Sequence, residues 1–326
     1  MHFDRRGFLL AVSGMAATLP VAASAARAAD YPVRPVRIVV GFAAGGATDI
    51  IARLIGEQLS KRFGQPFIVE NKPGAGSNIA VEAVLAAPAD GYTLLFVGPS
   101  NAINATLYDK LDFDFMRDIA PVAALARVPF VVVVSPSFPA KTIAEFINYA
   151  KANPGKLSIG TPGKGSGPHM AAELFEAMTG VGLTPVQYRG DAPALTDLMG
   201  GQIQACFNSL PAAIELIKSD KVRALATTAA TRSNFLPNIP TIAEYVPGYE
   251  ASASYGIGTR KGAPSAVIDE LSVAIQTILS DRQVEARLVG LGGTVLALSA
   301  ADFGELMAKE TAKWAKVIRS ADIKSD

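Results

Sequence analysis

Few side chains in this sequence have the chemistry for catalysis, and two of them lie in one glycine-rich segment, GTPGKGSGPH at residues 160–169. Ser166 lies three residues before His169, so a serine nucleophile with a histidine base is one interpretation. A nucleophile elbow, however, needs glycine two residues to each side of the serine, and Lys164 and Pro168 occupy those positions. No nearby acid is placed to orient the histidine. Because the motif is incomplete, a hydrolase or isomerase that uses His169 and Ser166 is only the alternative to the binding function described below.

Three glycine-rich loops offer backbone N–H groups that can bind an anion. They cover residues 41–49, 71–78 and 160–169. None completes a nucleotide-binding fingerprint, because the second has Ile79 where the third glycine is needed and the third has Lys164 before Gly165. Free amides at the start of a helix bind carboxylates and phosphates well. Each loop is equally compatible with a plain strand-to-helix turn, but the three together favour anion binding over catalysis.

Composition argues against several other classes of protein. With one cysteine and two histidines, of which His2 lies in the first 28 residues, the chain has no His-rich or Cys-rich metal site, and we expect no cofactor. Cys206 has apolar neighbours, which is typical of a buried, inert thiol. Removing residues 1–28 takes away three arginines and one aspartate, so the formal net charge changes from +1 to −1. A nearly neutral chain does not attract nucleic acid or an anionic membrane.

The first 28 residues have the three parts of a secretory signal. Arg5 and Arg6 give a positive start, an uncharged run follows to Ala26, and small residues lead to a cleavage site after Ala28. The arginine pair before Gly-Phe-Leu is typical of a twin-arginine signal, although general secretion signals also contain paired arginines. A membrane anchor is disfavoured because the apolar run is shorter than about 20 residues and contains Gly14 and Pro20. We expect export to the periplasm.

The remaining chain alternates strand and helix patterns, which predicts an α/β fold with mixed, mostly parallel sheets and helices on both faces. The length suggests about two domains. The first series has strands over 36–40, 67–69 and 92–97, with helices after the first two. The second has strands over 130–134, 157–159, 186–188, 205–207 and 222–226 and helices over 142–153 and 169–178. Residues 232–248 are expected as a connection, followed by helices over 265–279 and from 299. The pattern does not distinguish two independent domains from two lobes with crossing connections.

Several segments form an ordered set that is specific as a combination. They are YP at 31–32 with the strand at 36–40, GGATD at 45–49, VENKPGAG at 69–76, DGYTL at 90–94, FMRDIAPV at 115–122, YRG at 188–190 with APAL at 192–195, and LP at 236–237 with IPT at 239–241. In this combination the chain resembles the tripartite tricarboxylate transporter substrate-binding proteins, the Bug or TctC-like family. The resemblance covers essentially all of the chain after the signal. It implies a two-lobed Venus-flytrap fold, with lobe 1 at residues 31–128 plus 251–326 and lobe 2 at 129–250.

The resemblance also implies a function: a periplasmic solute-binding protein, not an enzyme, that captures a small organic carboxylate in an interlobe cleft by hinge closure. Its expected partners are that ligand and either the membrane permease subunits of a tripartite tricarboxylate transporter or a sensor kinase, and the protein itself is expected to be a monomer. Relatives hold the ligand carboxylate through loop amides, hydroxyls and ordered water. The corresponding ligand-binding residues here are Ala44, Gly45, Ser77, Ser100, Thr161, Gly165, Ser166, His169, Tyr188, Asn208 and Tyr255.

Three of these positions depart from the family pattern. Ala44 stands where relatives usually have proline, Asn208 where they commonly have aspartate, and Tyr255 where they often have tryptophan. Replacing an aspartate by Asn208 removes a negative charge that is able to pair with an amine. The sequence therefore predicts a ligand without an amino group.

Overall fold

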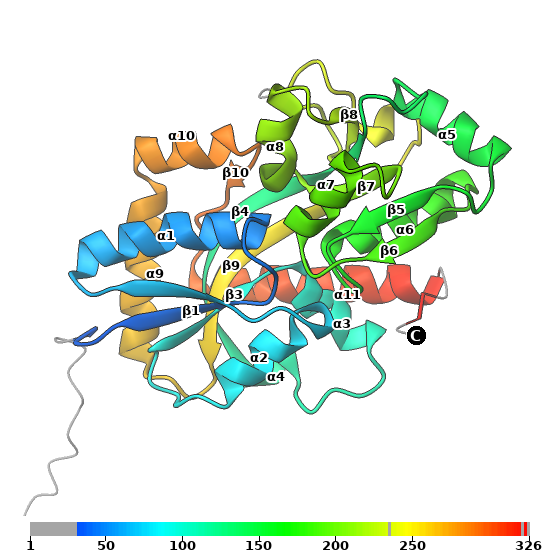
Figure 1. The fold of residues 1–326 in the computed structure, drawn as a ribbon. Helices are drawn as coiled ribbons and strands as arrows, with labels where there is room; N and C mark the ends of the chain where they lie inside the picture. Colours follow the sequence, from blue (N-terminus) through cyan, green and yellow to red (C-terminus); the bar gives the residue numbers. More distant parts are fainter. Residues whose placement is uncertain (1–30, 234–235, 321–322, 325–326) are drawn as a thin grey trace, which may run out of the picture.

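Strands and helices alternate along the chain and build one curled, mixed sheet with helices on both faces (Figure 1). The structure is a computed structural model, and it describes residues 31–233, 236–320 and 323–324. The export signal predicted over residues 1–28 lies outside this part. The α/β fold class predicted from the sequence is confirmed.

The N-terminal strand group consists of β1 (Val36–Val40), β2 (Phe67–Asn71) and β3 (Thr93–Val97), which pair in parallel in the order β2-β1-β3. β1 leads into α1 (Ala47–Phe63), β2 into η2 (Ala75–Ser77) and α2 (Asn78–Leu85), and β3 into α3 (Pro99–Leu107). α1 ends at Gly64, which has a φ of 68° and so adopts the left-handed conformation that suits a glycine. Because the strands are parallel, the loops that follow them lie at one edge of the sheet.

The central strand group consists of β5 (Ser158–Thr161), β6 (Thr184–Gln187) and β7 (Ala205–Ser209), which are parallel in the order β7-β5-β6. The helices α5 (Ile143–Ala152), α6 (Gly167–Thr179), α7 (Asp191–Met199) and α8 (Leu210–Lys218) alternate with these strands, and β8 (Arg223–Thr227) follows. Thr142 caps α5, because its Oγ1 accepts a hydrogen bond from Glu145 N at 3.2 Å.

Two long strands join the two groups. β4 (Ile119–Val134), which follows the short helix α4 (Phe115–Asp118), pairs antiparallel with β9 (Ser252–Arg260) along the whole length of β9. β9 also pairs with β3, and the far end of β4 pairs with β7 and β8. The sequence predicted only residues 130–134 of this pair, since alanine, glycine, serine and proline elsewhere in β4 and β9 are poor strand formers. Hydrogen bonds to neighbouring strands on both sides override that weak strand propensity.

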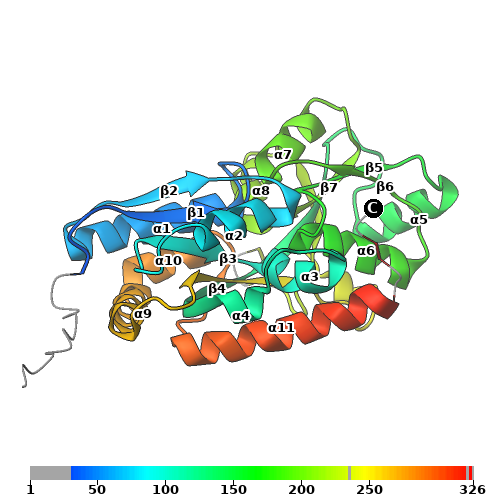
Figure 2. The ribbon, with the colours of Figure 1, turned by 90° about the horizontal axis from the view of Figure 1, so that it is seen from below.

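The C-terminal elements return to the N-terminal strand group. After β8, η3 (Ile242–Glu244) lies within the predicted connection to β9; then come α9 (Ser265–Leu279), α10 (Arg282–Gly290), β10 (Thr294–Val295) and α11 (Ala300–Ser320). α9 packs on α1 and β4, and α11 packs on α3 and β4. Figure 2 shows α11 as one long helix along the side of the molecule that carries α3 and α4. No helix in the described part of the chain is long and apolar enough to cross a membrane.

Candidate functional site

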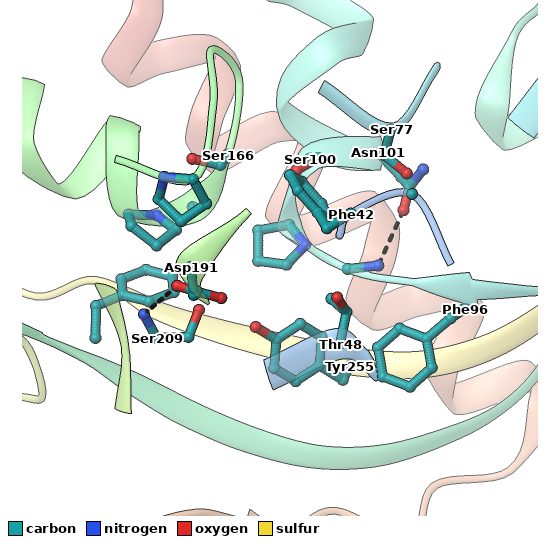
Figure 3. A pocket seen from close by; sticks show the side chains of 17 residues that line it. Phe42, Thr48, Ser77, Phe96, Ser100, Asn101, Ser166, Asp191, Ser209 and Tyr255 are labelled. Carbon is teal, nitrogen blue, oxygen red and sulfur yellow. Dashed lines mark hydrogen bonds between the residues drawn. The ribbon is translucent and has the colours of Figure 1, made fainter. Parts of the chain in front are cut away.

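A pocket lies where the loops of the N-terminal strand group face those of the central strand group (Figure 3). Its empty volume, including its open mouth, is about 440 Å³. The lining combines loop residues from both groups with three aromatic rings on or beside β3, β4 and β9: Gly41, Phe42, Thr48, Ser77, Phe96, Gly98, Pro99, Ser100, Asn101, Phe130, Pro162, Ser166, Gly167, Pro168, Asp191, Ser209 and Tyr255.

Several helices begin at this pocket. The residue that precedes α3 (Gly98), the one that precedes α6 (Ser166) and the one that precedes α8 (Ser209) all belong to the lining. Each helix therefore directs the positive end of its dipole at the pocket. None of the described lining residues is Lys, Arg or His. The pocket thus favours an anion through dipoles and neutral donors, without a cationic side chain.

Asn101 supplies an unused donor at one end of the pocket. Its side chain is 4% exposed, and its Oδ1 accepts a hydrogen bond from Gly98 N at 2.9 Å, which fixes the amide at the start of α3. Its Nδ2 is buried and has no partner among the described residues. Figure 3 shows this amide beside Ser77, with Ser100 on the same helix turn. A buried amide N–H without an acceptor is costly, so this end is suited to a ligand oxygen.

Asp191 places a carboxyl group in the lining, at the start of α7. Its Oδ1 accepts a hydrogen bond from Ser209 N at 2.8 Å, and its Oδ2 accepts one from Ala47 N at 3.3 Å. Burial raises the pKa of this carboxyl to about 6, and the two backbone donors oppose the rise. Asp191 therefore places a carboxyl group in the lining next to Asn208, so the asparagine at position 208 does not leave this end of the site without an acid.

The first glycine-rich loop is already occupied by the protein's own carboxylates. Asp49 Oδ2 accepts a hydrogen bond from Gly45 N at 3.0 Å, and Asp191 reaches Ala47 N from the central strand group. Burial alone raises the pKa of Asp49, but hydrogen bonds from Arg53, Gly45 and Asn71 hold it below its usual value. Ala44 and Gly45, predicted to bind the ligand, are outside the lining. The same loop contributes Gly41, Phe42 and Thr48 instead.

The third loop contributes Ser166, but not in the geometry of a hydrolase. Ser166 Oγ accepts a hydrogen bond from the backbone N of His169 at 3.2 Å and so caps α6. The imidazole of His169 is buried, its Nε2 lies 3.4 Å from Glu173 Oε1, and its Nδ1 has no partner among the described residues. Burial and nearby Lys164 lower the pKa of His169 to about 4. The hydroxyl and the imidazole are therefore not arranged as nucleophile and base.

The other predicted residues of the central strand group lie behind the pocket wall. Thr161 donates to Gln187 Oε1 at 2.6 Å, and Tyr188 donates to Asp197 Oδ2 at 2.7 Å. Asn208 is fully buried and its Nδ2 donates to the carbonyl of Asp191 at 3.1 Å. These hydrogen bonds lie within the central strand group, and the three side chains, like Gly165 and His169, are outside the lining.

Direct contacts join the two strand groups across the pocket. Ala43 N donates a hydrogen bond to Arg189 O at 2.9 Å, beside the contact of Asp191 with Ala47. Gly76, with a φ of 58°, approaches Lys164 so closely that a Cβ atom there would lie 2.6 Å from the carbonyl oxygen. The described conformation is thus one in which the two sides of the pocket touch.

Comparison with known proteins agrees with this architecture. Residues 51–323 match the model of the tripartite tricarboxylate transporter family receptor. BugT of Bordetella pertussis is 33% identical over 98% of this chain and 96% of its own. The chain belongs to the tripartite tricarboxylate transporter receptor family. The resemblance to the Bug or TctC-like proteins is therefore confirmed.

Two solved structures show the same fold as this TctC-family chain. Rpa4515 of R. palustris, solved with adipate, has a TM-score of 0.88 and 37% identity over 90% of this chain and 99% of its own. MatC from Rhodopseudomonas palustris, solved with malate, has a TM-score of 0.84 and 31% identity over 88% of this chain and 100% of its own. The two-lobed fold of periplasmic binding proteins is thus that of this chain as well.

Of the predicted residues of this TctC-family site, the structure brings Ser77, Ser100, Ser166 and Tyr255 into one lining. The sequence analysis missed Asp191, Ser209 and Asn101. Asp191 lies in the gap between the YRG and APAL segments, and Ser209 directly follows Asn208. A search for polar residues at the N-termini of the helices after β3, β6 and β7 would have found all three.

A buried, neutral His169 predicts a specific pH dependence of stability. Because its pKa is about 4 when folded and about 6.5 when unfolded, the unfolded chain binds the proton more readily and stability falls as pH drops below 6.5. Between pH 7.5 and 4.5 the wild-type protein should lose about 2 kcal/mol more unfolding free energy than His169→Gln. Urea unfolding at both pH values measures this difference, and equal losses would show that His169 is not buried in its neutral form.

Proposed function

We propose that this chain is a periplasmic solute-binding protein that captures a small organic carboxylate between its lobes and passes it to a membrane partner. The observation that carries the proposal is the buried, unpartnered Nδ2 of Asn101 in a pocket that the starts of α3, α6 and α8 surround. Relatives solved with adipate and malate support the ligand class. The membrane partner would be the permease subunits of a tripartite tricarboxylate transporter, which would receive the ligand, or a sensor kinase, which would recognise the closed form.

We place the lobes at residues 31–128 plus 251–326 and at 129–250. β4 crosses between these regions, the chain returns to the first region just before β9, and Pro129 pairs with Ser252 near the crossing. Bending at this point would separate the loop edges and open the pocket. A ligand that touches both sides binds the closed form better and so raises its population.

Neutral donors are sufficient for useful affinity. A hydrogen bond to a charged group contributes about 1.5–3 kcal/mol. Three or four such bonds, less the cost of association, give roughly micromolar binding. We propose that the protein binds without catalysing a reaction, acts as a monomer, and is exported by the signal over residues 1–28, through the twin-arginine route.

Changing Asn101 tests the binding proposal most directly. Asn101→Asp keeps the oxygen that accepts from Gly98 N but replaces the free donor with a second, negatively charged oxygen. Thermal-shift screening of small organic acids should first identify a stabilising carboxylate. Calorimetry with that carboxylate should then show affinity about a hundredfold weaker for Asn101→Asp, from the lost bond and the new repulsion.

The matched control is Thr142→Asp, which adds the same charge at the N-terminus of α5, away from the pocket, and keeps a capping oxygen. It should bind as the wild type does. If no small carboxylate stabilises the protein, or if Asn101→Asp binds as tightly as the wild type, the proposal fails. Detectable turnover of a bound ester or acid, lost in His169→Ala, would favour the hydrolase or isomerase instead.

Closure is tested at Gly76. An alanine Cβ there would meet Lys164 O at 2.6 Å, so Gly76→Ala should keep the two sides of the pocket apart and weaken carboxylate binding at least about tenfold. Gly155→Ala is the control, because Gly155 has a similar φ of 69° with open space around it. Both variants carry the same backbone strain, of about 1 kcal/mol. Equal affinities in calorimetry would mean that binding does not need this contact.

A further inference from the structure

Asp191 places an acidic side chain in a pocket that we propose for a carboxylate. Its side chain is 5% exposed and lines a pocket surrounded by features that attract anions. Each of its oxygens accepts one backbone hydrogen bond, from Ser209 N and from Ala47 N. A carboxylate oxygen can accept two such bonds. Asp191 thus retains acceptor capacity inside the pocket.

The charge of Asp191 is balanced by dipoles and not by a cation. The described lining contains no Lys, Arg or His, and the two backbone donors belong to the starts of α1 and α8. A second carboxylate beside Asp191 would therefore bring two like charges together in a buried site. In such pairs one partner must take up a proton.

The two ends of the pocket differ in chemistry. Figure 3 shows Ser77 and Asn101 at one end and Asp191 with Ser209 at the other, and the hydroxyl of Tyr255 points toward the Asp191 end. The first end offers donors, including the free Nδ2 of Asn101. The second offers the carboxylate of Asp191 together with two hydroxyls. A ligand that spans the pocket must present an acceptor at one end and a donor at the other.

We propose that Asp191 determines specificity, so that the pocket selects a carboxylate that carries a hydroxyl or ammonium group at its far end over a plain dicarboxylate of the same length. The ligand's carboxylate meets Ser77, Ser100 and Asn101, and its donor meets Asp191. This inference rests on the proposed carboxylate-binding function. It replaces the expectation, drawn from Asn208, that the ligand lacks an amino group.

The test compares matched probes by calorimetry on the exported protein at pH 7.5. One set is 4-hydroxybutyrate, 4-aminobutyrate and succinate; the longer set is 6-hydroxyhexanoate, 6-aminohexanoate and adipate. In at least one set a donor-bearing acid should bind about tenfold or more tighter than the dicarboxylate. The hydroxy and amino arms distinguish a neutral donor from a cationic one.

Asp191→Asn should reduce that preference to less than about threefold, mainly because the dicarboxylate gains affinity. Asp197→Asn is the matched control: it removes the same charge from the same helix, but Asp197 bonds to Tyr188 outside the pocket. It should keep the wild-type preference. Asp191→Ala provides a second test if the asparagine variant does not fold.

The pH dependence of ligand affinity provides a second test of the role of Asp191. Because burial raises the pKa of Asp191 to about 6, lowering the pH from 7.5 to 5 protonates it, so dicarboxylate binding should tighten and binding of the donor-bearing acids should weaken. The titratable groups that face Asp191 from β9 and β7 are Tyr255 and Cys206, and burial raises the pKa of both far above this range. Asp191→Asn should remove the difference between the two slopes and leave only the change that protonation of the ligands' own carboxyl groups causes.

The outcomes separate the two proposals. If dicarboxylates bind the wild type as tightly as the donor-bearing acids, or if Asp191→Asn changes neither the preference nor the slopes, Asp191 does not set specificity, while carboxylate binding stands. If none of the six probes binds, and no other small carboxylate stabilises the protein, the proposed function fails and this inference fails with it.

Discussion

The arrangement of the site depends on the antiparallel pairing of β4 with β9, which is the backbone connection shared by both strand groups. β9 continues into pairing with β3, and β4 continues into pairing with β7. The parallel strands on either side therefore end toward a common space, and the helices that follow them start there. Without that shared pair, the glycine-rich loops would belong to separate sheets with no fixed relation to one another.

The N-termini of the helices around the pocket have two roles: some bind the protein's own carboxyl groups, and others face the pocket. The start of α1 serves the protein itself, since Asp49 holds Gly45 N and Asp191 holds Ala47 N. The start of α8 is shared, because Ser209 N donates to Asp191, and the starts of α3 and α6 also face the pocket. On the proposed hinge, the contact of Asp191 with Ala47 and that of Ala43 with Arg189 form only when the lobes meet. The protein thus supplies part of the closing free energy, and a ligand has to add only the remainder.

Much of the fold could be predicted from the sequence, because the strands β1, β2, β3, β5 and β7 and the helices α1, α2, α5, α6 and α9 have clear hydrophobic patterns and caps. β9 and most of β4 could not, since their small residues become strands only through neighbours distant in sequence. For the site, the sequence predicted the loops that surround the pocket but not all of the side chains that line it. Which residue of a loop faces the pocket depends on contacts between residues distant in sequence or on neighbouring loops. Gly45 N is bonded to Asp49. Ser77 packs so closely on Gly41 that a Cβ atom at position 41 would clash with it. Asn208 predicts a site that lacks a negative charge, whereas Asp191, whose carbonyl accepts a hydrogen bond from Asn208, places a carboxyl group in the lining.

The lack of a cationic side chain in the described lining has a consequence for the rate of release. An arginine paired with the ligand carboxylate in this buried pocket would be bidentate and charge-assisted, and such pairs are among the strongest hydrogen bonds in proteins. At the proposed affinity, roughly micromolar, an association rate of about 10⁶ M⁻¹s⁻¹ would give a residence time on the order of one second. A carrier must retain its ligand long enough to meet a membrane partner and still give it up there. Dipoles and amides satisfy both requirements, because opening the lobes removes several moderate bonds together and leaves no single strong bond to hold the ligand.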